Sequence, residues 1–311
     1  MADSGPLPDL DWIAVDWGTS SLRVWALDLA GNVLARASSS AGMSRLSADD
    51  YERNLLDLAG GWLPGPNRGA IPVIVCGMAG ARHGWQEAAY RAVPCRPVAS
   101  GSMATVRTFD PRLTVKIIPG LCQSNPPDVM RGEETQLAGL IANGVTDGIV
   151  CMPGTHSKWV RLENGTVASF QTFMTGELFA LLSEHSILRH SVEETAEDDR
   201  SAFLKALGQM LDTPPNLTGA LFSIRARGLL STDGETNGRA MLSGFLIGAE
   251  LAACRPQWER RELRVIGARE LAARYAEALA SAGAMPVLED VEALTLAGLK
   301  QARAGMTEAD A

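Results

Sequence analysis

The sequence lacks the cysteine pattern of a metal site or of a disulfide framework. Its five cysteines form no Cys-x-x-Cys pair and no metal-ligand spacing with the four histidines. Cys76 and Cys151 lie in apolar runs, where a thiol is expected to serve as a small hydrophobic side chain. An odd number of scattered thiols suits a reducing compartment, and the first eleven residues resemble neither a secretory signal nor a transit peptide. We therefore expect a cytoplasmic location.

Long hydrophobic runs and a positive net charge are absent as well. The most apolar segment, residues 241–253, is too short to span a bilayer, so no membrane partner is expected. A formal net charge of −8 and a pI near 5.1 argue against nucleic acid as a partner. Only four of the 28 basic residues are lysines, so any anion-binding site is expected to use arginine. With 311 residues and 46% hydrophobic composition, the chain has room for two globular domains.

Two common nucleotide-binding motifs are missing, namely Gly-x-x-x-x-Gly-Lys-[Ser/Thr] and Gly-x-Gly-x-x-Gly. Residues 11–25 offer a different arrangement: an apolar run that ends in Asp16, a short turn, and an alternating run. This pattern predicts a strand, a tight hairpin and a second strand. The turn holds small and hydroxyl residues whose amides could bind an anion beside a cation on Asp16, namely Gly18, Thr19 and Ser20. A plain β-hairpin would explain the same residues equally well.

A second copy of the pattern favours the functional interpretation. Residues 149–160 repeat it in register: Gly154 follows Gly18 by 136 positions (154 − 18 = 136), and the same offset maps Thr19 onto Thr155. Each copy continues into a third strand, so each half is expected to open with an antiparallel β-meander. A repeat of this kind identifies a duplicated fold more securely than either motif alone. We expect an α/β protein with domains at 1–146 and 147–311.

The remaining elements follow from periodicity and from breaker residues. Strands are expected near 71–76, 116–119, 263–269 and 285–288. Helices are expected near 49–63, 133–142, 175–188, 202–211, 217–230, 241–254, 270–281 and 291–302. The proline-rich segment 122–129 predicts an irregular connection. Segment 191–200 predicts an exposed connection or the start of a helix, and segment 231–238 a polar loop.

The two hairpins resemble the phosphate-binding hairpins of the actin-like ATPase and sugar kinase superfamily. Within it, the chain is most similar to the 2-dehydro-3-deoxygalactonokinase family, the sugar-acid kinases of galactonate breakdown. The similarity extends from about residue 12 to about residue 275, and the runs 131–137 and 153–159 are its most specific parts. The segments that carry it are 41–46, 77–80, 118–122, 130–137, 152–159, 174–178 and 246–250.

This resemblance implies two RNase H-like (actin-like ATPase) domains, each with a mixed sheet flanked by helices, and an active site in the cleft between them. It also implies ATP-dependent phosphorylation of the terminal C6 hydroxyl of 2-dehydro-3-deoxy-D-galactonate, with Mg²⁺ held by Asp16 through water. The nucleotide would be bound by the two hairpin turns and by a strand-to-helix turn in the second half: Asp16, Gly18, Thr19, Ser20, Gly154, Thr155, His156, Gly267 and Ala268.

The catalytic base of the superfamily lies at the start of the helix that joins the domains. Glu133 and Glu134 occupy that place here. We favour Glu134, which keeps the acid-x-amide spacing of related kinases, and retain Glu133 as the second choice. The structural alternative is that both acids simply stabilise the positive end of the helix. That position predicts a lowered pKa for the catalytic carboxylate.

A keto-deoxy sugar acid carries a carboxylate, for which a bidentate arginine is the natural partner. Arg45 has the best claim, while Arg131 could instead orient the catalytic acid or lie near phosphate. The residues expected to contact the substrate share a position near loop ends: Arg45, Gly80, Arg82, Arg131, Gly176 and Glu177. A homodimer is compatible with the sequence.

Several alternatives remain open. The acceptor could instead be 2-keto-3-deoxygluconate, which differs at one stereocentre, or pantothenate, as in type III pantothenate kinases. A phosphatase or nucleotide hydrolase could use the same fold with water as the acceptor. A sugar-sensing regulator or binding module is disfavoured, because no helix-turn-helix extension precedes the first hairpin and because Asp16, Glu134 and both Gly-Thr turns are intact.

Overall fold

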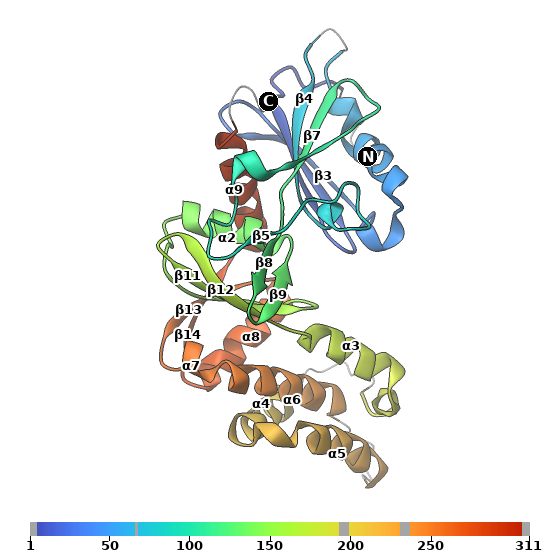
Figure 1. The fold of residues 1–311 in the computed structure, drawn as a ribbon. Helices are drawn as coiled ribbons and strands as arrows, with labels where there is room; N and C mark the ends of the chain where they lie inside the picture. The colour runs from blue at the N-terminus through green and yellow to red at the C-terminus, as the bar shows by residue number, and fades with distance from the viewer. Residues whose placement is uncertain (1–4, 66–67, 193–198, 231–236, 307–311) are drawn as a thin grey trace. The chain divides into compact units, whose positions relative to one another are not determined.

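The computed structural model describes residues 5–65, 68–192, 199–230 and 237–306 (Figure 1). Their contacts divide the chain into two compact units. The first unit consists of Met1–Thr146, Glu163–Ser169 and Val291–Ala311, and the second of Asp147–Leu162 and Phe170–Asp290. The expected connections at 191–200 and 231–238 lie mostly outside the described residues.

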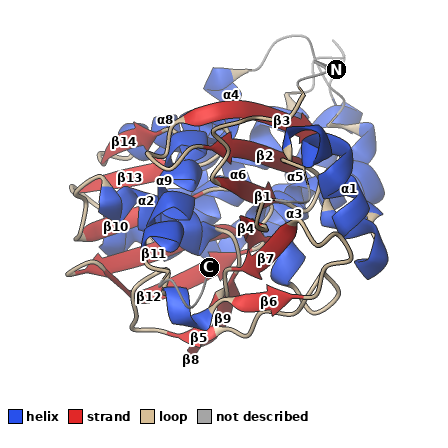
Figure 2. Cartoon of the chain, turned by 90° about the horizontal axis from the view of Figure 1, so that it is seen from above, coloured by secondary structure: helices blue, strands red, loops and turns tan. Residues whose placement is uncertain are grey.

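A six-stranded sheet forms the centre of the first unit, and several of its neighbouring strands can be followed in Figure 2. β1, β2 and β3 are antiparallel, β1, β4 and β7 are parallel, and β6 closes the far edge in antiparallel orientation. The order across the sheet is β3 (Val33–Ser39), β2 (Leu22–Leu27), β1 (Trp12–Trp17), β4 (Ile71–Gly77), β7 (Leu113–Ile117) and β6 (Ala104–Val106).

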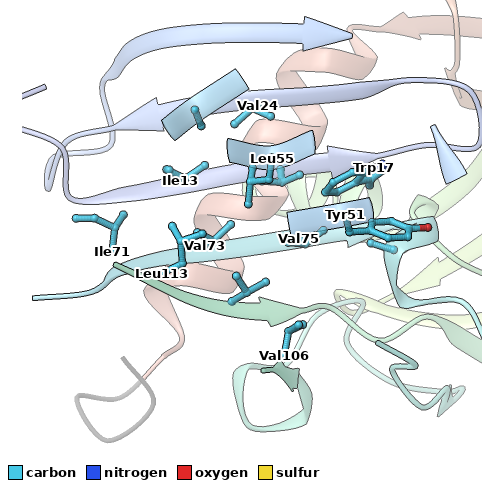
Figure 3. Close-up of a cluster of buried hydrophobic side chains, with 14 of the residues drawn as sticks. Ile13, Trp17, Val24, Tyr51, Leu55, Ile71, Val73, Val75, Val106 and Leu113 are labelled. Atoms are coloured by element: carbon cyan, nitrogen blue, oxygen red, sulfur yellow. The ribbon is translucent and has the colours of Figure 1, made fainter. Parts of the chain in front are cut away.

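Both faces of this sheet are buried, as the continuous apolar runs of β1 and β4 require. Ile13, Val15 and Trp17 point to one face, where α1 (Tyr51–Ala59) covers them through Tyr51 and Leu55 (Figure 3). The alternate residues of β1 point to the other face, where they pack against α9 (Val291–Ala304). The two-residue period of a strand thus builds two separate hydrophobic cores.

The second sheet repeats the topology of the first. β10 and β11 are antiparallel, while β10, β13 and β14 are parallel, as β1, β4 and β7 are. The order is β12 (Thr166–Phe173), β11 (Ser157–Glu163), β10 (Gly148–Met152), β13 (Glu262–Ile266) and β14 (Met285–Glu289). The expected duplication into two RNase H-like domains, each opening with an antiparallel meander, is confirmed.

The helices of the second unit surround one nearly all-apolar helix, α6 (Gly238–Ala253), which is buried as its composition predicts. It packs tightly on α4 (Arg200–Asp212): a Cβ atom built on Gly248 would lie 2.8 Å from the carbonyl oxygen of Leu207. The other helices of this unit are α3 (Thr175–His185), α5 (Leu217–Leu230), α7 (Arg255–Trp258) and α8 (Arg269–Ser281). Among the described helices, we find none with the length and apolar character of a bilayer-spanning segment.

The C-terminal helix α9 belongs to the first unit, although the sequence places it in the second half. It packs backbone to backbone against α2 (Glu133–Ala142). Cβ atoms built on Gly139 and Gly298 would overlap the carbonyl oxygens of Leu294 and Thr135, respectively. The expected domains 1–146 and 147–311 therefore differ from the contact units at residues 291–311, and also at 163–169, where Val167 bridges to Cys95.

The proline-rich segment after β7 is a hairpin, so the expected irregular connection is wrong. β8 (Leu121–Ser124) and β9 (Pro127–Met130) pair in antiparallel orientation, and β5 (Arg91–Ala92) adds a third strand. Asn125 and Pro126 form the turn. Pro127 lies at the end of its strand, where a missing backbone N–H is tolerated. The short strands β5 and β6 had no counterpart among the expected elements.

Candidate active site

The first hairpin presents Asp16 at the end of β1. Arg23, its partner across the hairpin, forms an ion pair with Asp16 and places Nε 3.1 Å from Oδ2. The Cys76 thiol donates to Oδ1 at 3.7 Å. The amide of Gly18 donates to the Ser21 carbonyl at 2.8 Å and closes the turn, whose tip is exposed. The carboxylate is thus oriented beside an open turn, as a phosphate or metal site would need.

The segment that contains Arg45 lies directly on this hairpin. The amide of Met43 donates to the Gly18 carbonyl at 3.1 Å, and that of Ser44 donates to the Thr19 carbonyl at 3.0 Å. A Cβ atom on Gly42 would overlap the backbone of Ser20, so only glycine allows this approach. Arg45 itself is exposed and has one weak contact, from Nη1 to the Ser40 hydroxyl at 3.5 Å. The structure therefore brings Arg45 and the first hairpin together.

The start of α2 reaches the same end of the sheet. Gly77 and Gly132 have φ values of +85° and +104°, a region that favours glycine. A Cβ atom on Gly132 would be 3.4 Å from the Cα of Gly77. A Cβ atom on Gly77 would also be 3.6 Å from Oδ1 of Asp16. Burial raises the pKa of the Cys76 thiol, and the charges of Asp16 and Glu134 raise it further. The two acids singled out in the sequence thus lie close together in the first unit.

Glu134 is fully buried, with 0% of its surface exposed. The amide of Gly132 donates to Oε2 at 2.7 Å, and the Thr135 hydroxyl donates to Oε1 at 3.3 Å. Burial, followed by the charge of Glu133, raises the pKa of Glu134 to about 8. The expected lowering of this pKa is wrong, because removal from water outweighs the helix terminus and the hydrogen bonds. A carboxyl with a strongly raised pKa is a candidate for acid–base catalysis, and it accepts a proton only in its ionised form, whose share grows as the pH rises towards 8.

This raised pKa predicts a specific pH dependence of stability. The pKa of Glu134 is 4.5 in the unfolded chain and about 8 in the folded chain. The contribution of this carboxyl to the free energy of unfolding is therefore fully present below about pH 4.5 and is lost as the pH rises towards 8. Between about pH 5 and about pH 8, the free energy of unfolding should fall more in the wild type than in Glu134→Gln, by up to about 1.4 kcal/mol per pH unit. Urea titrations at several pH values measure this difference. A difference that does not change with pH would contradict the buried state of Glu134.

Glu133 differs from its neighbour in exposure. Its side chain is partly exposed, and its Oε2 accepts a hydrogen bond from the Arg131 amide at 3.0 Å. This contact fixes the backbone that leads into α2. Glu133 therefore has a local structural role that accounts for its position, while a catalytic role stays a prediction.

Arg131 and Gly80, two of the expected substrate residues, are in contact. Nη2 of Arg131 donates to the Ala88 carbonyl at 2.8 Å, and the guanidinium lies 4.4 Å from the centre of the Tyr90 ring. A Cβ atom on Gly80 would be 2.7 Å from Nη1. The charge of Arg131 also lowers the pKa of Glu134, so its position fits the alternative of orienting the acid. Arg82 is exposed in the loop after Gly80.

In the second unit, the turn of Gly154, Thr155 and His156 is held by the first turn of α3. The amide of Glu177 donates to the Thr155 carbonyl at 2.9 Å, and its carboxylate lies 2.6 Å from Nε2 of His156. A Cβ atom on Gly176 would overlap the Gly154 carbonyl oxygen. Gly176 and Glu177 thus support the second hairpin. Their expected contact with the sugar acid stays a prediction, and the other four expected substrate residues belong to the first unit.

A cavity of about 630 Å³ opens beside this turn, within the range of small-molecule sites. The hairpin and α3 contribute Gly154, Thr155 and Phe179 to its lining, and α6 and α8 contribute Arg239 and Arg274. Arg239 also lies 5.0 Å from the centre of the Phe179 ring. Asp199 and Glu270 line the cavity as well, so it combines two cationic and two acidic side chains with apolar walls, and its size suits a nucleotide.

Gly267 and Ala268 lie next to this cavity but do not line it. A Cβ atom on Gly267 would be 2.9 Å from the carbonyl oxygen of Pro153, so the turn after β13 presses against the start of the hairpin. Ala268 precedes α8, whose lining residues begin at Glu270. Their expected contact with adenosine stays a prediction.

Comparison with known proteins decides the family. The model of the family described as 2-keto-3-deoxy-galactonokinase matches residues 16–302. The chain belongs to the 2-keto-3-deoxy-galactonokinase family. A protein of Rhizobium meliloti (strain 1021) named "Probable 2-dehydro-3-deoxygalactonokinase" is 42% identical over 298 residues, covering 94% of this chain and 96% of that protein. The 2-dehydro-3-deoxygalactonokinase of Escherichia coli (strain K12) is 35% identical over 275 residues, covering 88% and 90%.

A solved structure agrees with this assignment. The crystal structure of a Sinorhizobium meliloti protein that carries the same kinase name has a TM-score of 0.84 and 39% sequence identity, and covers 94% of this chain and 97% of that one. The suspected membership in the 2-keto-3-deoxy-galactonokinase family is therefore confirmed.

Sequence reasoning missed the cavity walls that α6 and α8 contribute in this member of the 2-keto-3-deoxy-galactonokinase family. Asn237, Arg239 and Arg274 carry no motif, and they come together only when α6 and α8 pack beside the hairpin. One sequence feature pointed in this direction. The segment 246–250 belongs to the family resemblance, although its apolar character suggested only a buried helix.

Proposed function

We propose that this chain transfers the γ-phosphate of ATP to the C6 hydroxyl of 2-dehydro-3-deoxy-D-galactonate in galactonate catabolism. Family membership supports the reaction. The observation that carries the assignment of the nucleotide site is the cavity of about 630 Å³ beside the second hairpin. Within the first unit, Asp16 and Glu134 lie near one another: a Cβ atom on Gly77 would be 3.6 Å from Oδ1 of Asp16, and one on Gly132 would be 3.4 Å from the Cα of Gly77. No P-loop is needed, because the hairpin turns supply the amides and hydroxyls.

In the proposed reaction, the C6 oxygen attacks the γ-phosphorus and Glu134 takes the hydroxyl proton. The bond between the γ-phosphorus and the bridging oxygen breaks, and ADP leaves with that oxygen. Phosphoryl transfer of this kind depends on positioning and charge more than on covalent chemistry. We assign phosphate contacts to Gly18, Thr19 and Ser20 of the first hairpin and to the turn Gly154–His156 of the second.

We also propose Asp16 as the residue that would hold Mg²⁺. It is a single carboxylate beside an open turn, which fits an ion that keeps several waters and takes few protein ligands. When bound, the ion would neutralise phosphate charge. Arg23 shares this carboxylate, so it would have to give up part of its ion pair.

For the substrate carboxylate we propose Arg45. It is exposed, lies on the first hairpin, and would lose only the weak Ser40 contact on turning to a ligand. Arg131 is held by Ala88 and Tyr90, which favours a role in positioning the loop and the acid. An Arg45→Lys variant keeps the charge but loses the two-pronged contact. An unchanged KM for the sugar acid in that variant would exclude Arg45.

Two further proposals concern the protein as a whole. The five cysteines are all free, which supports a cytoplasmic location. The exposed apolar side chains of α5, namely Phe222, Leu229 and Leu230, support a homodimer. Sedimentation velocity tests the latter, and a single monomeric species at micromolar concentration would exclude it.

The function is tested by identifying the product. The protein is incubated with Mg-ATP and one of three acceptors: 2-dehydro-3-deoxygalactonate, 2-keto-3-deoxygluconate or pantothenate. Mass spectrometry detects the added phosphate, and ³¹P and ¹³C NMR show whether it is on C6. We expect a C6 phosphate of the galactonate derivative. Phosphorylation of pantothenate alone, or of no acceptor, would contradict the proposal.

A further inference from the structure

A buried carboxylate lies behind the second hairpin, and none of the roles given so far uses it. Glu250 of α6 is only 2% exposed and does not line the cavity. Side chains from several elements donate hydrogen bonds to it, among them Nε1 of Trp159 to Oε1 at 2.9 Å, the Tyr275 hydroxyl to Oε2 at 2.8 Å, and the Thr175 hydroxyl to Oε2. Burial raises the pKa of Glu250, and these hydrogen bonds oppose that shift.

Each of these donors comes from a different element of the second unit, and two of them, Thr175 and Tyr275, line the cavity. Trp159 is on β11, three residues after His156. Thr175 begins α3, whose next residues clamp the hairpin turn. Tyr275 is on α8 and lines the cavity, and its hydroxyl also lies 3.0 Å from Oγ of Ser157, the residue that follows the turn. Glu250 therefore joins β11, α3 and α8 to α6 at one point.

The contacts around the turn leave little freedom once this network is formed. Thr175 fixes the start of α3, and a Cβ atom on Gly176 would already lie 2.9 Å from the Cα of Thr155. A small shift of α3 would therefore move the Gly154–His156 turn directly. Displacements of about 1 Å at a reacting group can cost on the order of 10²-fold in rate. A buried carboxylate that fixes the position of the turn is therefore expected to matter for the reaction.

We propose that Glu250 is a positioning residue for the nucleotide: it holds the second hairpin, α3 and α8 in the arrangement that binds the phosphates of ATP. This inference rests on the proposed kinase function. It concerns nucleotide affinity specifically, because Arg45 and Glu134, to which we assigned the sugar carboxylate and the C6 hydroxyl, belong to the first unit.

The test measures binding of the non-hydrolysable analogue AMPPNP with Mg²⁺ by calorimetry, together with the separate KM values for ATP and the sugar acid. Glu250→Ala should raise the Kd for AMPPNP about tenfold or more and raise the KM for ATP, with the KM for the sugar acid nearly unchanged. Glu250→Gln should recover most of the affinity, because its amide can accept from Trp159 and donate to the two hydroxyls.

Two further variants separate positioning from general stability. Trp159→Phe removes one hydrogen-bond donor to Glu250 at a residue that does not line the cavity. This variant keeps the inference testable if Glu250→Ala does not fold. Leu279→Ala is the matched control: Leu279 is fully buried in the same hydrophobic core as Trp159 and Tyr275, and its truncation should lower the melting temperature while it leaves every hydrogen-bonding group of the network in place. We expect weaker AMPPNP binding in Trp159→Phe, and a Kd within about twofold of the wild type in Leu279→Ala.

Normal AMPPNP affinity in the folded Glu250→Ala and Trp159→Phe variants would overturn the inference. So would an equal loss of affinity in Leu279→Ala, since that would make the effect one of stability alone. A wild-type protein that binds no AMPPNP would overturn the kinase proposal, and this inference with it. Failure of this inference alone would instead show as normal AMPPNP binding by both the wild type and the Glu250→Ala variant.

Discussion

Replacing Glu134 with glutamine is expected to lower kcat by about 10²- to 10⁴-fold, the usual effect of losing a general base. Glutamine keeps the size of the side chain and can still accept a hydrogen bond from the Gly132 amide, so the start of α2 should be preserved. The KM values should change little, because the carboxylate acts on the proton that leaves in the transition state. Steady-state ADP release with saturating Mg-ATP and sugar acid measures this loss.

Glu133→Gln is the matched control for this prediction. Glu133 has the same chemistry, lies one residue away and is partly exposed. Glutamine keeps an oxygen that can accept from the Arg131 amide, so the backbone before α2 should be preserved and kcat should fall by at most about tenfold. If kcat fell by about 10²-fold or more in Glu133→Gln while Glu134→Gln stayed active, Glu133 would be the base and Glu134 a buried structural acid.

Gly298→Ala should have the largest effect on stability. A Cβ atom at this position would overlap the Thr135 carbonyl oxygen and lie 3.0 Å from its Cγ2, so α9 would have to move away from α2. Overpacking of this kind lowers the free energy of unfolding by about 1–3 kcal/mol. The opposing atoms belong to the backbone of α2, which cannot move aside as a flexible side chain could. Because Thr135 follows Glu134, activity should fall as well. Urea unfolding and kcat are the two measurements.

Gly208→Ala provides the comparison. Gly208 is also inside a helix, α4, but a Cβ atom there would meet nothing within 4 Å. Alanine in a helix with free space should leave stability unchanged or raise it by up to about 1 kcal/mol. If Gly298→Ala were as stable as Gly208→Ala, the close packing of α2 on α9 would be refuted.

The parts of the fold that sequence reasoning predicted well are those with strong local patterns. β1 ends at Trp17, as the apolar run before the first turn predicts, and α2 and α5 have the expected bounds of 133–142 and 217–230. The repeat of the hairpin at an offset of 136 residues predicted the shared topology of the two sheets. Local periodicity and duplication are both properties of the sequence itself.

The parts that could not be predicted depend on contacts between distant residues. The position of α9 is set by Gly139 and Gly298, which are neutral or unfavourable helix residues until the two backbones meet. The hairpin β8–β9 was hidden by prolines that are harmless at its turn and strand end. The cavity walls unite α3, α6 and α8, which no spacing in the sequence connects.

The pKa of Glu134 shows the same limit for the site. Its place at a helix N-terminus argues for a lowered value, and that argument is correct for an exposed carboxylate. The sequence does not show that the folded chain buries the side chain completely. Tertiary burial reverses the sign of the shift, and with it the expected pH dependence.

The central claim is that the chain uses ATP to phosphorylate a sugar acid, and acceptor-dependent ADP release tests it most directly. Purified protein is assayed with Mg-ATP in the presence and absence of 2-dehydro-3-deoxygalactonate. We predict ADP release only with the sugar acid, in amounts equal to the phosphorylated product. ADP release at the same rate without an acceptor would contradict the kinase and indicate a nucleotide hydrolase on the same fold.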